Sequence, residues 1–405
     1  MSEITDTNEI TDTNEITNAN EITDANIKLI VKDYITPATR AQIIEKYGDI
    51  NTWDVSNVTN MASLFSNMSR FNKDISKWNV SKVTNMDSMF MYNSSFNQPL
   101  NEWNVSKVTN MDRMFHRAID FNQPLNGWNV SKVTNMDRMF DTAESFNQSL
   151  NGWDVSNVTS MKGLFQSTRN FNQPLDAWNV SKVTDMSNMF TVALKFNQPL
   201  DTWDVSNVRN MRAMFSRAIS FNQPLNKWNV SNVTDMESMF ANASSFNQPL
   251  NAWNVSNVTN MRSMFDSASS FNQPLNMWNV SNMTNMIGMF IRANALMTND
   301  KKPSEENYNK YLLEENKIPA TRLANEGALS QHNLPKGVMK TVYQYLDPER
   351  AGELENIDLD TDFRKRYPEP PTGGKSRRNK SRRNKNKSRK NKSRNRRNKN
   401  KRNRK

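Results

Sequence analysis

The sequence predicts an α/β repeat protein in which about ten 25-residue coils stack on one another. All ten tryptophans, which begin at Trp53 and end at Trp278, are spaced 25 residues apart. One phenylalanine column begins at Phe65 and a second at Phe71, and both keep the same period. No insertion or deletion breaks this register. One structural unit is therefore repeated along the middle of the chain.

Each unit begins with a segment that favours a short strand. In the unit around Trp103, the segment Leu100–Val105 places Trp103 and Val105 on the same side of an extended chain. Asn104 then lies on the opposite side. We therefore expect one strand of about six residues in each coil.

The next segment of the unit favours a short helix. Between 108 and 115, apolar residues recur at positions i, i+3, i+6 and i+7, which is the spacing of a helical face. Ser106 or Thr109 can serve as the N-cap. Pro124 prevents a helix where the chain returns. A short strand and a short helix thus fill one coil.

The unit length and its aromatic content together predict stacking. Twenty-five residues are too few for paired helices, which need about 33, and fall within the roughly 20–29 residues of a leucine-rich-repeat coil. One unit cannot bury a Trp, two Phe and two Met alone, but stacked units can. Asparagine columns such as that of Asn97 could form ladders between coils. The predicted core includes Trp103, Val105, Val108, Met111, Phe115, Phe121, Trp128 and Phe140.

The repeated motif also resembles a known family. The unit FNQPLNEWNVSKVTNMDRMF, residues 96–115, is similar to the BspA-like leucine-rich-repeat family, first noticed in surface proteins of mycoplasmas. The resemblance covers about Ile50 to Met297. It implies a right-handed solenoid with a strand face and a helix face. It also implies binding or adhesion rather than a reaction.

The N-terminal region divides into two predicted parts. Residues 1–26 contain four hexapeptides of the type EITDTN and are expected to form a disordered tail, with an extra strand on the solenoid as the alternative. Residues 27–50 are expected to cap the solenoid of residues 51–297. In this cap, 27–31 is strand-like, and a helix begins at Thr36-Pro37 and ends at Gly48.

The C-terminal region also divides into two predicted parts. Residues 298–367 are expected to form a helical cap, and residues 368–405 a linker followed by a disordered basic tail. The segment from Leu334 to Pro348 loosely resembles the opening of an F-box, which would imply a ubiquitin-ligase adaptor.

Charge is separated along the chain. The net charge is +12, but residues 375–405 contain nine Lys, ten Arg and no acid, so the other residues sum to −7. Such a tail suits nucleic acid or another polyanion, nuclear import, or an anionic membrane surface. The residues expected to bind the polyanion include Lys375, Arg377, Arg378, Arg382, Arg383, Arg396 and Arg397.

No group of residues in the sequence predicts catalysis or a cofactor. The chain has no Cys, and its only histidines, His116 and His332, lack a metal-ligand spacing. His116 occupies a variable turn and is expected to be solvated. The acidic pairs are expected on exposed faces. We therefore predict no enzyme, no cofactor and no metal site.

The sequence also lacks a signal peptide and a transmembrane segment. This favours an intracellular or virion location over secretion, and here the chain departs from exported members of the family that it resembles. Neither the host nor the oligomeric state follows from the sequence.

Two sets of positions differ between otherwise similar units. One is the turn after each predicted helix, such as 116–117 and 216–217. The other precedes each Trp and includes the candidate partner surface Lys77, Glu102, Thr202, Lys227 and Met277. These positions either recognise a ligand or have drifted freely. The predicted function is a protein-interaction scaffold whose tail binds a polyanion, with a surface adhesin or an F-box-like adaptor as alternatives.

Overall fold

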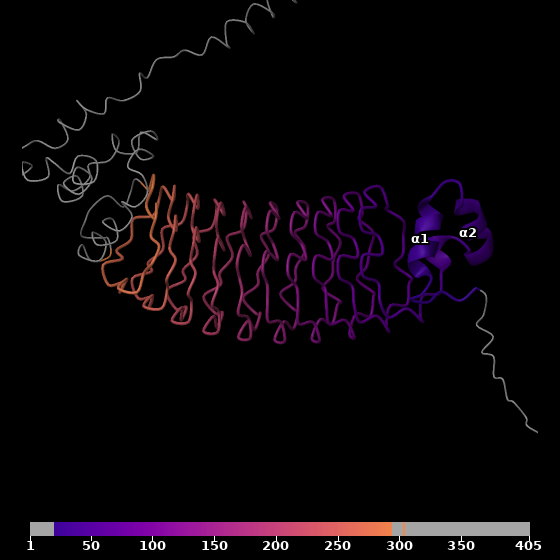
Figure 1. Cartoon of the computed structure of the whole chain (residues 1–405), viewed down its shortest axis with the longest axis horizontal. Coiled ribbons are helices and arrows are strands. Elements are labelled where there is room, and N and C mark those ends of the chain that lie inside the picture. The colour runs from indigo at the N-terminus through magenta and orange to yellow at the C-terminus, as the bar shows by residue number, and fades with distance from the viewer. Residues whose placement is uncertain (1–19, 294–302, 304–405) are drawn as a thin grey trace, which may run out of the picture. The chain divides into compact units, whose positions relative to one another are not determined.

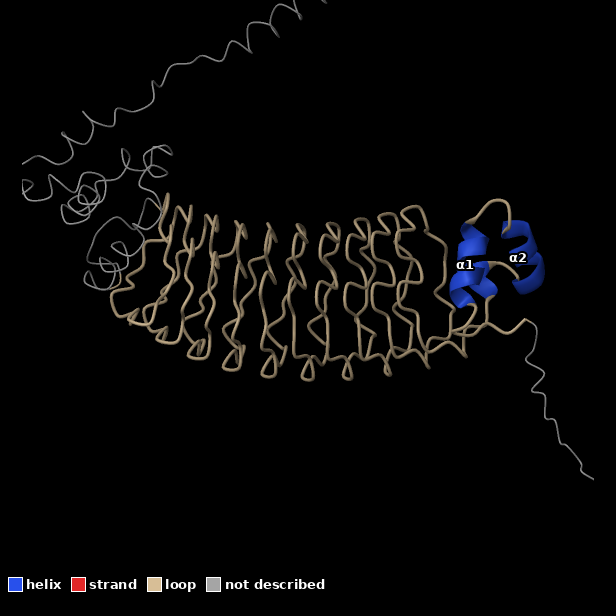
Figure 2. Cartoon of the chain, viewed as in Figure 1, coloured by secondary structure: helices blue, strands red, loops and turns tan. Residues whose placement is uncertain are grey.

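The computed structural model describes residues 20–293 and residue 303. The described residues form helix α1 (Ile27–Ile35), helix α2 (Arg40–Tyr47) and a short 3₁₀ helix, η1 (Ile50–Thr52). Beyond η1, the described chain consists of turns, bends and isolated bridges (Figure 2). In Figure 1, α1 and α2 lie at the N-terminal end of a row of coils that follow one another in sequence order.

A ladder of backbone contacts holds the coils in register. Parallel bridges join Asn60 to Asn85, Asn85 to Asn110 and so on to Asn285, with every step 25 residues long. Beside each bridge, an amide donates to the equivalent residue of the preceding coil, as Thr134 does to the Thr109 carbonyl over 3.0 Å. The period in the sequence is therefore the period of the structure.

The prediction of a helix over 108–115 is wrong. Met111, Arg113 and Phe115 donate their amides to carbonyls of the next coil, over 2.8–3.1 Å. The amides between them close three-residue turns, for example from Met114 to the Met111 carbonyl. Arg113 also has a φ of 51°, which a right-handed helix excludes. A series of tight turns places every third or fourth side chain inward as a helix does, so the apolar spacing could not separate the two.

The prediction of a strand over 100–105 is also wrong. The chain turns at 101–102, and the Trp103 amide donates to the Leu100 carbonyl over 3.1 Å. The segment that follows does place Trp103 and Val105 in the core. It forms no ladder of its own, because the bridge between coils lies further along, at Asn110.

Stacked aromatic rings fill the interior. Trp178 lies over Trp203, with ring centroids 6.4 Å apart and ring planes 3° apart. Within one coil, Phe115 and Phe121 stack at 4.0 Å, and each stacks on its equivalent in the next coil. The eight residues expected in the core are all buried, and their exposed fractions do not exceed 3 %. Such offset stacking adds to the energy of burial.

Each indole N–H is also satisfied by the coil before it. Trp128 Nε1 donates to the Leu100 carbonyl over 2.8 Å, and the same bond recurs 25 residues later from Trp153 to Leu125. An unpaired indole N–H in this interior would cost about 1–3 kcal/mol. The bond thus fixes the orientation of the ring as well as its depth.

The asparagine columns connect the coils through side chains and backbone amides. Asn97 Oδ1 accepts from the Asn122 amide, and Asn101 Oδ1 accepts from the Gly127 amide, both over 2.9 Å. Asn104 instead accepts from the Ser106 amide within its own coil. Some of the columns therefore bridge coils, and others shape local turns.

The N-terminal cap differs from the prediction for residues 27–50. Residues 27–31 are part of α1 and not a strand, because the Ile and Val side chains pack along one helical face. α1 buries Ile27, Ile30, Val31 and Tyr34, and Tyr34 meets Trp53 edge to face at 5.4 Å. α1 therefore covers the first ring of the tryptophan column.

The second helix of the cap begins later than expected. α2 starts at Arg40, after Thr39, whereas Thr36 ends α1 and donates its hydroxyl to the Lys32 carbonyl. None of the residues of α2 is buried, so its expected apolar face is only partly covered. Gly48 does end the helix, with a φ of 79°.

The fourth hexapeptide, Glu21–Asn26, is ordered on the first coil, which contradicts a disordered tail that extends to residue 26. Thr23 bridges to Asn57, and Ile22 is buried. The predictions for residues 1–19 and 298–367, including the F-box-like segment and the helical cap, lie outside the described residues, as does the basic tail. The right hand of the coil and its leucine-rich-repeat class stay predictions.

Positive φ angles at non-glycine residues predict a stability difference. Val192 has a φ of 60°, which is unfavourable for a β-branched side chain, whereas Asn242 has a φ of 59° at the equivalent position two coils later. We expect Val192→Asn to raise the free energy of unfolding by about 0.5–1 kcal/mol and Asn242→Val to lower it by a similar amount. Urea denaturation measures both, and a shift of the same sign in the two variants would contradict this account.

Candidate functional site

The 25-residue register gathers the residues that precede each Trp into one exposed column, here called the pre-Trp column. Its members, including the candidate surface residues, are all exposed. They are Lys77, Glu102, Gly127, Gly152, Ala177, Thr202, Lys227, Ala252 and Met277. Met277 is the most exposed large apolar residue that the structure describes, at 73 %.

The backbone of the pre-Trp column is held from the preceding coil. The amides of Gly127, Ala177 and Met277 donate to the side chain of an Asn 26 residues earlier, over 2.9–3.0 Å. Lys227 Nζ lies 2.7 Å from Asp201 Oδ2, and Thr202 Oγ1 donates to the Asp176 carbonyl. The column therefore presents different side chains from one fixed backbone.

A small hollow of about 270 Å³ lies beside the pre-Trp column. It is lined by residues 101–105 with Gly127 and Asn129. A Cβ at Gly127 would come within 2.8 Å of the Asn101 carbonyl, so only glycine allows the two coils to approach this closely. The hollow exposes Glu102 beside the edge of Trp103.

A larger polar groove of about 690 Å³ runs across several coils. Thr184 Oγ1 donates to the Thr159 carbonyl, and Asn207 Nδ2 donates to the Ser181 carbonyl. Lys182 and Arg209 supply its positive charge. The sequence analysis did not identify this groove, although Arg209 marks it by interrupting a column of threonines. Its lining is Thr159, Lys182, Thr184, Asn207, Arg209, Asn232, Thr234 and Asn257.

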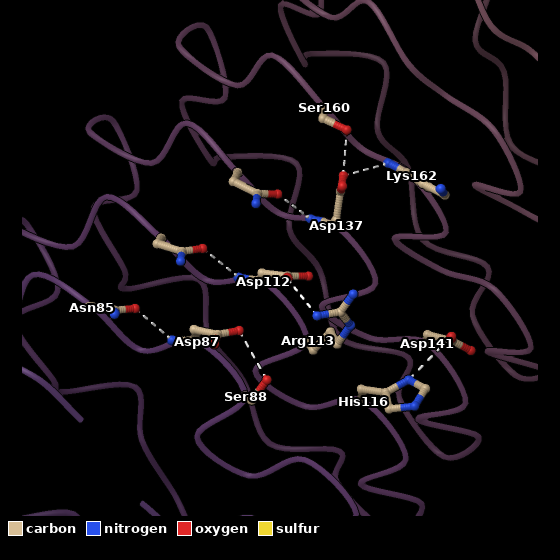
Figure 3. Close-up of polar contacts among 12 residues, drawn as sticks. Asn85, Asp87, Ser88, Asp112, Arg113, His116, Asp137, Asp141, Ser160 and Lys162 are labelled. Carbon is tan, nitrogen blue, oxygen red and sulfur yellow. Dashed lines mark hydrogen bonds and ion pairs between the residues drawn. The ribbon is translucent and has the colours of Figure 1, made fainter. Parts of the chain in front are cut away.

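Three aspartates stack on successive coils, as Figure 3 shows. Asp87 accepts from Ser88 Oγ, Asp112 pairs with Arg113 at 3.0 Å, and Asp137 accepts from Ser160 Oγ and the Lys162 amide. We name Asp87, Asp112 and Asp137 the aspartate ladder. Its members thus contact neighbouring residues of the stack.

The environment of Asp112 disfavours its charge. Asp112 Oδ1 is buried without a hydrogen-bond partner among the described residues. Burial raises the pKa of Asp112, as do the charges of Asp87 and Asp137, while Arg113 opposes the shift. The expectation that acidic residues lie only on exposed faces is wrong here, because the register, and not the local sequence, brings these carboxylates together.

His116 lies in a packed environment, which contradicts the expectation of a solvated side chain. Its side chain is 13 % exposed, and Nδ1 lies 3.2 Å from Asp141 Oδ2 (Figure 3). Tyr92 meets the imidazole ring edge to face at 5.2 Å, and Arg117 lies over the Tyr92 ring. Residues from three successive coils thus enclose His116.

Two further searches concern the described part of the chain alone. Between residues 20 and 293, no cluster of three or more His, Asp or Glu residues has a geometry suited to a metal ion. In the same part of the chain, neither α1 nor α2 has the length and apolar character that a membrane crossing requires. The polyanion-binding residues from Lys375 to Arg397 and His332 lie outside the described residues.

The geometry defines a repeat protein whose coils are joined by backbone pairing in a fixed register. The model of one family, described as "Mycoplasma protein of unknown function, DUF285", matches residues 38–153, 145–245 and 199–303. These overlapping matches cover more than half of the chain, so the chain belongs to this mycoplasma-type repeat family. No curated protein matches the sequence.

The aspartate ladder predicts an unusual response to pH. A carboxyl group whose pKa is raised in the folded state destabilises the fold when it is ionised, and this penalty disappears as the pH falls through that pKa. We expect Asp112→Asn to raise stability at pH 7, with a gain that shrinks toward pH 4. Urea denaturation at a series of pH values measures this effect.

Asp204 provides a control of opposite sign. Hydrogen bonds from the Ser206 side chain and amide lower the pKa of Asp204, so its carboxylate stabilises the fold above the ordinary pKa and loses this effect as the pH falls. Asp204→Asn should therefore lower stability at pH 7 and matter less in acid. A loss of stability at pH 7 in the Asp112→Asn variant would refute the role given to the ladder.

Proposed function

We propose that this chain is a non-catalytic scaffold in which the stacked coils bind a protein partner and the basic tail binds a polyanion such as nucleic acid. We further propose that the stack is a right-handed solenoid of the BspA-like leucine-rich-repeat class. The family supports a repeat protein, and the finer assignment rests on the motif of residues 96–115.

The observation that carries the proposal is the pre-Trp column. Its backbone is fixed by asparagine side chains, while its side chains range from Lys77 and Glu102 to Met277. A rigid backbone that displays different exposed side chains suits recognition, because little conformational entropy is lost on binding. The exposed Met277 supplies an apolar contact, since flexible thioethers adapt to varied partners.

The buried polar residues support structural roles and not catalysis. Asp137 is bonded to Ser160 and the Lys162 amide, and Asp141 lies beside His116 and accepts from Thr142 Oγ1. These contacts connect one coil to the next or brace a turn. They account for the charged groups of Figure 3 without a substrate.

The separation of charge supports the second half of the proposal. Residues 375–405 carry +19, whereas the rest of the chain sums to −7. Because the tail contains no aromatic residue, it would act through charge alone and not through base stacking. Binding by charge alone weakens steeply as salt is added.

Deletion of residues 375–405 tests the polyanion half. We expect the full chain to be retained on immobilised duplex DNA at low salt and to be released as salt rises, because counterions compete for the phosphates. The shortened chain should pass through unretained, with an unchanged circular-dichroism spectrum. Equal retention of the two chains would refute the tether.

Site-specific cross-linking tests the partner half. The chain has no Cys, so a single cysteine can carry a photo-cross-linker without interference. Thr202→Cys lies in the pre-Trp column, and Arg217→Cys, an exposed residue of the other variable set, is the matched control. We expect one protein adduct of defined mass from Thr202→Cys and at least tenfold less from Arg217→Cys. Equal yields at the two positions would contradict a docking surface on the pre-Trp column.

A further inference from the structure

The face of the first coil that points toward the N-terminus has no preceding coil to pair with. In later coils, the amide at the position of Thr59 donates to the carbonyl one coil earlier, as Thr84 does to the Thr59 carbonyl over 2.8 Å. For Thr59 itself, no such coil exists. We call the backbone of residues 57–60 on this side the leading edge.

Asp24 supplies the missing acceptor. Asp24 Oδ1 accepts from the amides of Thr59 and Asn60 over 2.8 and 3.0 Å, and Oδ2 accepts from Thr59 Oγ1 over 2.5 Å. Burial acts to raise the pKa of Asp24, but these three hydrogen bonds together outweigh it, so that the pKa lies below its usual value. A carboxylate thus takes the place of a backbone carbonyl, in a charge-assisted form.

The other residues of the hexapeptide Glu21–Asn26 complete the fit. Glu21 Oε1 accepts from Asn57 Nδ2 over 2.6 Å, Ile22 is 4 % exposed in the core, and Thr23 bridges to Asn57. Asn26 braces the segment, because its Oδ1 accepts from the Thr23 amide and its Nδ2 donates to the Glu21 carbonyl. Five of the six positions therefore have a defined role, and only Ala25 is exposed without one.

The three preceding hexapeptides repeat these roles to different degrees. Residues 3–8 and 9–14 are both Glu-Ile-Thr-Asp-Thr-Asn, which changes only the exposed fifth position. Residues 15–20 are Glu-Ile-Thr-Asn-Ala-Asn, in which Asn18 replaces the aspartate. An amide at this position keeps one acceptor oxygen but loses the charge and the second oxygen.

We propose that the leading edge is a binding site for acidic hexapeptides of the sequence Glu-Ile-Thr-Asp-x-Asn, and that residues 3–8 and 9–14 are competent occupants of it in addition to Glu21–Asn26. The hexapeptide array is then a set of equivalent edge caps, with the copy at 15–20 the weak member. The occupied site prevents the exposed edge from pairing with another chain. This inference is independent of the proposed partner and polyanion.

Internal deletions in the full chain test the proposal, because each places a different copy directly before Ile27. Deletion of 15–26 brings residues 9–14 to this position, and deletion of 21–26 brings residues 15–20. The readout is amide hydrogen exchange at Thr59 and Asn60, which reports this edge even where the other coils are unchanged. Exchange at Met161, in a central coil, checks that the stack remains folded.

We expect deletion of 15–26 to leave exchange at Thr59 and Asn60 within about twofold of the original chain. Deletion of 21–26 should accelerate it by about tenfold, and Asn18→Asp in that variant should restore protection. Deletion of all four copies, residues 3–26, should accelerate it further. The proposal fails if deletion of 15–26 exposes these amides as fully as deletion of 3–26 does, or if Asn18→Asp restores nothing.

Discussion

The structure depends on the pairing of each coil with the next at a spacing of 25 residues. Alternate amides between 111 and 117 reach across to the following coil, while those between them close turns within the coil. Both sets of bonds are needed, because the backbone polar groups of a buried coil have no water to bond with. One inserted residue would break the bonds to both neighbours, which accounts for the strict register.

The same pairing explains an unfavourable backbone. Arg113 and Arg117 have positive φ, and equivalent positions recur in every coil, mostly without glycine. Each such residue costs about 1–2 kcal/mol relative to a right-handed conformation. The bonds between coils and the stacked rings of Phe115 and Phe121 offset this cost. Stacking therefore imposes the conformation, which the isolated segment would not adopt.

A stack of coils has two ends, and its N-terminal end is closed by two different means. Tyr34 of α1 covers the ring of Trp53, while Asp24 satisfies amides that a preceding coil would otherwise bond. Apolar and polar groups of the edge thus receive separate partners. The faces that remain exposed differ between coils, and their variation at positions such as Glu102 and Met277 is what a recognition surface requires.

The sequence by itself determined the period, the core columns and the low content of chemically reactive groups. Those features depend on residue types that recur at fixed intervals, such as Trp103 and Trp128, and a period is visible without coordinates. Only the tertiary structure decided the conformation of each coil, because turns and a helix place the side chains of Val108 and Met111 in the same way. It also decided the neighbours of His116, Asp112 and Asp24. Their partners lie on other coils, so no local pattern in the chain contains them.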